Sequence, residues 1–136
     1  MRNPDDYSLC DLAITTALSG VALTPVQNLE GMLAATISAR FAWGSGGTSC
    51  KAYVQVTHDS GVTWDDIACF AFGTTSATKK INLSGLTPVT NPVTPSDGAM
   101  ADNTFQDGFL GAAMRAKLVT TGTYSNTILS VKLSAR

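Results

Sequence analysis

Charged residues are scarce in this sequence, and glutamate is almost absent. They make up 14% of the 136 residues, whereas globular proteins average about a quarter, and Glu30 is the one glutamate. A free monomer generally carries more surface charge to remain soluble. The scarcity therefore predicts that other protein chains, in a homo-oligomer or a larger assembly, cover part of the surface. Threonine occurs 18 times, and its abundance with valine, alanine and glycine favours strands over helices.

Long apolar runs and basic clusters are also missing. No run reaches the length that spans a membrane, and the first residues lack the apolar core of a signal peptide, so synthesis in a cytoplasm is expected. The basic residues are scattered, and Lys79 and Lys80 are the only adjacent pair. Neither a membrane nor a nucleic acid is therefore expected as a partner.

Cysteine is limited to Cys10, Cys50 and Cys69, an odd count with no CxxC spacing. This count argues against a disulfide framework and against a zinc site. A hairpin centred on Ser60 would place Cys50 and Cys69 nearly opposite each other, which makes a cross-strand disulfide conceivable. Two buried thiols are the favoured alternative, because a cytoplasm is reducing.

Residues for catalysis or metal binding are few. His58 is the only histidine, and its neighbours Asp59 and Ser60 share its turn, whereas a catalytic triad is assembled from separate elements. Asp65 and Asp66 are adjacent on a strand and are expected to point to opposite faces. The aspartates of a later loop do not follow the spacing of a compact calcium loop; they are Asp97, Asp102 and Asp107. We therefore expect no enzyme activity, no cofactor and no metal.

The stretch from residue 57 to 64 carries the clearest local motif. It fits the pattern Ser/Thr-x-Asp-x-Gly-x-Thr-Trp, which resembles the Asp-box of sialidases and other β-proteins. The matching residues are Thr57, Asp59, Gly61, Thr63 and Trp64. Asp59 is expected to cap a turn, Gly61 to allow the reversal with a positive φ, and Trp64 to fold back over the hairpin. By family resemblance, a sialidase would show several arginines, a Tyr–Glu pair and the repeated blades of a propeller. This chain has one glutamate and one such box, so the motif predicts a structural β-hairpin.

Alternation of apolar and polar residues predicts seven or eight short strands. The segments are Asp11 to Thr16, Val21 to Leu23, Met32 to Trp43, Cys50 to Val56, Trp64 to Phe72, Ala77 to Leu83, Phe109 to Thr120 and Thr127 to Leu133. A helix from Leu29 to Ala39 is the alternative for one of them, but its β-branched residues favour the strand. Such a series is typical of a single all-β domain over residues 1–136, an antiparallel β-sandwich or a jelly-roll-like barrel. The lysine pair at 79–80 indicates an exposed edge strand.

Two segments do not fit the strand pattern. Residues 1–10 are predicted to form a polar N-terminal arm or a short docking segment. Residues 84–108 are predicted to form an extended loop, because three prolines interrupt any regular pairing and loops of this length are usually functional or disordered. This loop either lies on a partner or neighbouring subunit or packs on its own domain. Its candidate interaction residues are Pro88, Val89, Pro92, Val93, Pro95, Met100 and Phe105.

Aromatic residues offer a further alternative. Trp43, Trp64, Tyr53 and Tyr124 could form a platform for a sugar, although aromatic residues at strand spacing more often belong to a core or an interface. Because the sequence does not distinguish these possibilities, a carbohydrate-binding module is kept as an alternative hypothesis for the chain.

The order of motifs over about the last two-thirds of the chain resembles small virion proteins of tailed bacteriophages and related particles. The motifs are residues 54–64, Lys80-Ile81-Asn82-Leu83, the Asp-Gly and Ala-Asp-Asn-Thr sequences of the loop, and Leu118 to Thr127. Such proteins are similar to capsid decoration (cement) proteins, which bind the outer shell between major capsid proteins, often as trimers. The resemblance implies a non-enzymatic structural protein on the capsid surface of a virion. Its expected partners are the major capsid protein and further copies of itself. A tail or baseplate component is the alternative within the same class.

Overall fold

The computed structural model describes all 136 residues and contains strands but no helix, and so no helix long and apolar enough to cross a membrane. The prediction of an all-β protein is confirmed. The strands are β1 (Asp5–Ala13), β2 (Ser19–Ala22), β3 (Ala34–Ala42), β4 (Ser45–Gly46), β5 (Ser49–Thr57), β6 (Asp65–Phe72), β7 (Ala77–Ser84), β8 (Ala113–Thr121), β9 (Tyr124–Ser125) and β10 (Ile128–Ala135).

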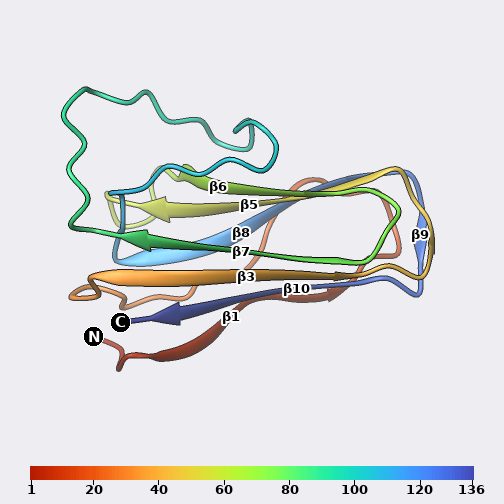
Figure 1. The fold of residues 1–136 in the computed structure, drawn as a ribbon, viewed down its shortest axis with the longest axis horizontal. Coiled ribbons are helices and arrows are strands. Elements are labelled where there is room, and N and C mark those ends of the chain that lie inside the picture. The colour runs from red at the N-terminus through yellow and green to blue at the C-terminus, as the bar shows by residue number, and fades with distance from the viewer.

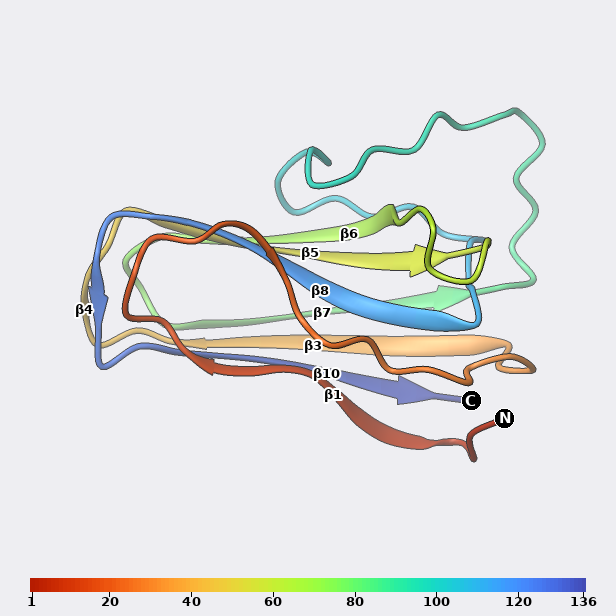
Figure 2. The same ribbon diagram turned by 180° about the vertical axis from the view of Figure 1, so that it is seen from behind.

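Two four-stranded antiparallel sheets lie face to face (Figure 1). Their strand orders are β1-β10-β3-β7, which we call sheet A, and β2-β8-β5-β6, which we call sheet B. The short strands β4 and β9 pair with each other and close one end (Figure 2). Pairing is nested along the chain, with β1 on β10, β2 on β8, β3 on β7 and β5 on β6. A chain of nested pairs rolled into two sheets is a jelly roll, so the topology that the sequence left open is now established.

The core forms where the alternating residues of the two sheets meet. In β3, Ile37, Ala39 and Phe41 are fully buried, whereas Thr36 and Arg40 face solvent. This period of two confirms the strand and rules out the helix considered from Leu29 to Ala39. The core face of β10 shows the same alternation; it consists of Leu129, Val131 and Leu133. Phe41 also stacks on Phe72 of β6 at 5.0 Å between ring centroids, so the two sheets are joined by aromatic packing.

Strands β5 and β6 are buried on both faces, unlike the strands of sheet A. One face packs on the core. On the other face, the segment between β7 and β8 contacts sheet B through Asp97, which bonds to Gln55 and Lys117, and through Asp102, which pairs with Lys51. This double cover explains why the sequence from residue 64 to 72 is an almost continuous apolar run. Part of residues 84–108 therefore packs on its own domain, as one of the two alternatives for this loop predicts.

The prediction of an N-terminal arm at residues 1–10 was wrong. The first strand begins at Asp5 instead of Asp11, and β1 pairs with β10 along sheet A. Leu9 and Cys10 are buried and hold this strand on the core. The segment looked like an arm because β1 is an edge strand, whose outward side chains are polar.

The hairpin register separates the two cysteines that looked opposite. Cys50 pairs with Phe72, and Cys69 pairs with Tyr53 on the other face of sheet B. A register shift between Val54 and Gln55 moves the pairing away from a turn centred on Ser60. All three cysteines are free and buried. Burial raises the pKa of Cys10 to about 11 and that of Cys50 to about 12, so both remain thiols at neutral pH.

Candidate interaction surface

The long loop returns along the open edge of β6. The backbone N–H of Asp66 donates to Ser96 O at 2.8 Å, and that of Cys69 donates to Thr104 O at 3.0 Å. In the other direction, Gln106 N donates to the carbonyl oxygen of Ile67 at 2.8 Å. We call residues 96–108 the anchored segment. Because these bonds occupy the outward backbone groups of β6, the anchored segment closes this edge of sheet B.

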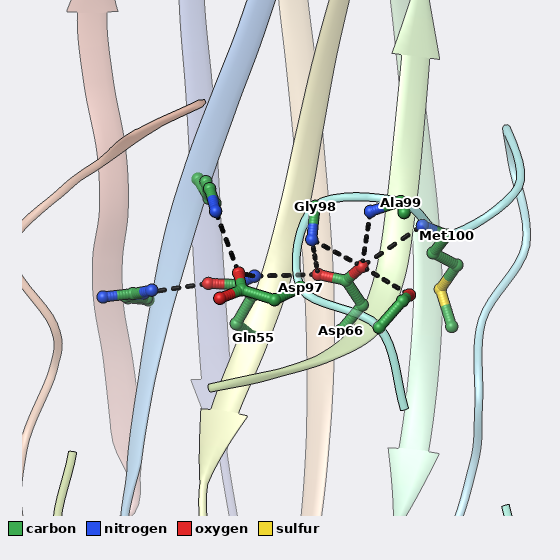
Figure 3. A network of polar contacts seen from close by, with 9 residues as sticks. Gln55, Asp66, Asp97, Gly98, Ala99 and Met100 are labelled. Atoms are coloured by element: carbon green, nitrogen blue, oxygen red, sulfur yellow. Dashed lines mark hydrogen bonds and ion pairs between the residues drawn. The ribbon is translucent and has the colours of Figure 1, made fainter. Parts of the chain in front are cut away.

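The Asp66 carboxylate fixes the start of the anchored segment (Figure 3). Its Oδ2 accepts the consecutive backbone N–H groups of Gly98, Ala99 and Met100 at 2.8, 3.0 and 3.2 Å. The Ser96 hydroxyl donates to the same oxygen at 2.8 Å. Successive N–H groups that converge on one anion form a nest, and here the anion is a buried side chain of the chain itself. The loop is therefore fixed by charge-assisted hydrogen bonds.

Gln55 connects this carboxylate to the rest of sheet B. Its Nε2 donates to Asp66 Oδ1 at 2.8 Å and to Asp97 Oδ1 at 2.6 Å, and its Oε1 accepts from Arg115 Nε at 2.9 Å (Figure 3). Asp97 also forms an ion pair with Lys117 at 2.9 Å. The hydrogen bonds from Lys117 and Gln55 lower the pKa of Asp97. The fully buried amide is thus satisfied by charged neighbours, as a buried polar group requires.

Asp107 fixes the other end of the loop, next to β7. Its Oδ1 accepts the backbone N–H of Ser84 at 2.7 Å, and its Oδ2 accepts the Thr87 hydroxyl at 2.9 Å. The bond from Ser84 lowers the pKa of Asp107. Beside it, Gly108 has φ of +94°, and a Cβ there would lie 2.8 Å from the backbone oxygen of Thr87, so this position favours glycine.

Between the two aspartates, residues 86–95 extend away from the sandwich (Figure 1). We call them the projecting segment. Residues 88–95 form no backbone–backbone hydrogen bond, and three prolines restrict their backbone dihedrals. The side chain of Leu86 is 71% exposed, and those of Val89 and Val93 are 37% and 40% exposed. A stiff, exposed and apolar segment of this kind is typical of an interaction surface.

The seven predicted interaction residues divide between the two segments. Five of them lie on the projecting segment and are exposed; they are Pro88, Val89, Pro92, Val93 and Pro95. Met100 is half-buried near the Asp66 carboxylate. Phe105 forms a β-bridge with Ala68, while its side chain is 52% exposed. The candidate surface is therefore centred on the projecting segment, and the anchored segment supports it.

The hairpin motif has the predicted structural geometry. The Thr57 hydroxyl donates to Asp59 Oδ1 at 2.9 Å and accepts the N–H of Gly61 at 2.8 Å. Asp59 accepts both the N–H and the hydroxyl of Thr63, at 2.8 and 2.6 Å, and φ at Gly61 is +90°. Trp64 is largely buried, and the Arg115 guanidinium lies 4.3 Å from its ring centroid. All five motif residues thus act in forming the turn.

The other candidate residues have separate partners. His58 Nε2 lies 3.1 Å from Leu110 O, and its Nδ1 lies 3.7 Å from Asp65. Of the three loop aspartates, Asp97 and Asp107 are described above, and Asp102 pairs with Lys51 at 2.9 Å. No group of three or more His, Cys, Asp or Glu side chains is placed to hold a metal ion.

The four aromatic residues do not form a common platform. Tyr124 is buried in the core, where its hydroxyl donates to Gly73 O at 2.8 Å. Trp43 donates its ring N–H to Gly46 O at 2.9 Å, near the same end of the sandwich. Trp64 lies at the other end under Arg115, and Tyr53 is buried on the outer face of β5.

Gln55, Asp66 and Arg115 were not predicted as site residues. A polar amide at the centre of an apolar strand, opposite an aspartate in the next strand, is a signal that could have identified Gln55 and Asp66.

Comparison with known proteins found no match to this chain among protein-family models, curated proteins or solved structures.

Acid is expected to destabilise the protein through three turn-forming aspartates. The pKa of Asp59 is lowered by the Thr63 hydroxyl, and the pKa values of Asp97 and Asp107 are lowered by the hydrogen bonds described above. A carboxylate whose pKa is lower in the folded than in the unfolded chain stabilises the fold at pH values above its unfolded-state pKa. This stabilisation is lost as the pH falls toward the folded-state pKa. The melting temperature should therefore decrease below about pH 4. Thermal unfolding measured in steps from about pH 6 to about pH 2 tests this. The dependence should flatten when all three residues are changed to asparagine, and an equally steep dependence in that variant would assign it to other groups.

Proposed function

We propose that this protein is a capsid decoration (cement) subunit of a tailed bacteriophage or related particle. In this role it binds the outer shell between major capsid proteins and stabilises it, without enzymatic activity. It is synthesised in the host cytoplasm and then resides on the surface of the virion. It also self-associates, and the resemblance of residues 54–127 to decoration proteins favours a trimer.

The observation that carries this proposal is the projecting segment. Its exposed residues Leu86, Val89 and Val93 offer apolar contact area. Its prolines reduce the conformational entropy that binding would cost. Asp66 and Asp107 hold its two ends on a rigid jelly roll, so the segment reaches a partner in a defined orientation.

Stabilisation of the shell would follow from mass action. A subunit that contacts two or more neighbouring capsid proteins can bind only when those proteins are assembled in the correct arrangement. A subunit that binds only the assembled shell shifts the equilibrium between free and assembled capsid proteins toward the assembled shell. The shift grows with the ratio of the free subunit concentration to the dissociation constant. The low charge of the chain fits a protein whose surface is largely covered in the assembly.

Quantitative mass spectrometry of purified virus particles tests the proposal. A decoration subunit should be present in a fixed ratio to the major capsid protein, and it should remain with heads after tails are removed. Recovery only with tails would favour the tail or baseplate alternative. Absence from both fractions would refute a virion role of either kind.

The carbohydrate-binding alternative receives no support from the positions of the aromatic residues. Arg115 covers Trp64, and the ring N–H of Trp43 is bonded within the chain. A glycan-array screen separates the two functions, since binding that is lost in Trp64→Ala, with folding intact, would favour the carbohydrate module.

A further inference from the structure

We infer that the two open edges of sheet A pair with each other between neighbouring copies, β7 of one copy alongside β1 of the next. This inference specifies the self-association within the proposed function. Its test requires no virus particle, so the two can fail separately.

The edges of sheet B are closed or short, whereas the edges of sheet A are long and open. The anchored segment closes the edge of β6, and β2 has only four residues. Strand β7 has eight residues, and it pairs only with β3. Ser84 directs its N–H away from β3, to Asp107, and alternate residues of an antiparallel strand do the same. The backbone groups of Thr78, Lys80 and Asn82 therefore point away from the sheet, and all three residues are exposed.

A space for an additional strand exists beside β7. Because the anchored segment extends sheet B beyond β6, sheet B is wider than sheet A on this side of the sandwich. A cavity of about 140 Å³ lies in the resulting step. It is lined by Cys69, Phe70, Lys79, Lys80, Ile81, Asn103 and Thr104. A strand hydrogen-bonded to β7 would lie beneath the anchored segment and would be covered by it.

Strand β1 fits this position in length and in backbone geometry. It has nine residues, and it pairs only with β10. Arg136 and Ala34 exchange both backbone hydrogen bonds, which fixes the alternation along β10 and therefore along β1. Asp6 and Asp11 consequently direct their backbone groups outward, and both are exposed.

The charges of the two edges are opposite. Within β1 the charged residues are Asp5, Asp6 and Asp11, and within β7 they are Lys79 and Lys80. Pairing β7 with a second β7, or β1 with a second β1, would place like charges opposite each other, which is destabilising. Lys79 donates to Ala71 O and Asn103 Oδ1 within the chain, so Lys80 is the available lysine, and pairing β7 with β1 places it near the aspartates. Of these, Asp11 also lies 3.9 Å from Lys132 of β10. The charges therefore disfavour the symmetric pairings and favour the heterologous one.

Strand direction agrees with this arrangement. Neighbouring strands of sheet A alternate in direction, so β1 and β7 run opposite ways within one copy. A second copy in the same orientation then brings its β1 antiparallel to β7 of the first. Such head-to-tail contacts generate a closed ring if the rotation between copies closes, and an open chain if it does not.

The test is the molar mass of the purified chain of residues 1–136 as a function of concentration, measured by analytical ultracentrifugation at low and at high salt. The wild type should exceed the 14.1 kDa of one chain as concentration rises, and salt should weaken the association. Lys80→Glu should weaken it about tenfold, because it places an acidic residue opposite the aspartates of β1. Asn82→Pro should abolish it, because proline removes an outward N–H that has no partner within the chain.

Two further variants separate edge pairing from general charge effects. Arg40→Glu carries the same charge change on an exposed residue of the central strand β3, and it should leave the association unchanged. The double variant Lys80→Glu/Asp11→Lys restores opposite charges across the contact and should recover most of the wild-type association. A monomer at all concentrations would overturn the inference. An oligomer that Lys80→Glu and Asn82→Pro leave intact would do the same.

Discussion

Replacing Asp66 with asparagine is expected to lower the free energy of unfolding by about 3 kcal/mol. The carboxylate accepts three backbone N–H groups, the Ser96 hydroxyl and the Gln55 amide. Asparagine has one acceptor oxygen, and its NH₂ group would face either the backbone donors or the Gln55 Nε2. Either the backbone N–H groups of the loop or the Gln55 amide then loses its acceptor while remaining buried. The negative charge that strengthened each of these hydrogen bonds is also lost. For a domain of this size, the melting temperature should fall by about 10 °C.

Hydrogen exchange measured beside thermal unfolding shows where this loss occurs. The amides of Gly98, Ala99 and Met100 should lose protection in Asp66→Asn, because these groups are the donors in the native loop. Asp65→Asn is the matched control: its carboxylate is 30% exposed and lies 3.7 Å from His58, so its effect should be below about 1 kcal/mol. Equal effects of the two substitutions, with unchanged exchange at residues 98–100, would contradict the role given to Asp66.

The sequence predicted the features of this fold that depend on local patterns. The alternation in β3 and β10 follows from the requirement that one face of each strand packs on the core, and that requirement leaves a period of two in the sequence. The Thr57–Trp64 hairpin is specified by side chains that bond within eight consecutive residues. Strand β7 was recognised as an edge because its lysines are placed where a central strand would not tolerate them.

Features that depend on distant contacts were not predicted. In the register of β5 and β6, Val54 pairs with Ala68 and Gln55 pairs with Asp66, so Ile67 is an extra residue in β6. This one residue places Cys69 on the face opposite Cys50. The N-terminal edge strand has few inward residues, so its signal was too weak to distinguish from a polar arm. The role of Asp66 depends on donors more than 30 residues away, and only the nested topology brings them together. The same topology revealed that residues 84–108 consist of a projecting and an anchored segment with different roles.

Because residues 84–108 contain a projecting and an anchored segment, a test of the interaction surface must change the first and leave the second intact. Deleting residues 88–106 would remove the donors that satisfy Asp66 and expose Tyr53 and Cys69, which are buried on the outer face of sheet B. Loss of shell binding in such a variant would then follow from misfolding as readily as from a missing contact. Substitutions confined to the projecting segment avoid this, because its exposed side chains contribute little to the stability of the domain.

The double variant Leu86→Ser/Val93→Ser is therefore expected to keep the wild-type melting temperature within a few degrees and to lose at least about a hundredfold in affinity for shells. The two side chains are exposed and apolar, so burying them against a partner would contribute favourable free energy to binding. Co-sedimentation of the purified protein with shells that lack it measures the affinity. Ile128→Ser, which removes a comparably exposed apolar side chain at the opposite end of the sandwich, is the control and should bind normally. If the double variant binds as well as Ile128→Ser does, the projecting segment does not contact the shell, and the sheet edges of the jelly roll become the surfaces to test next.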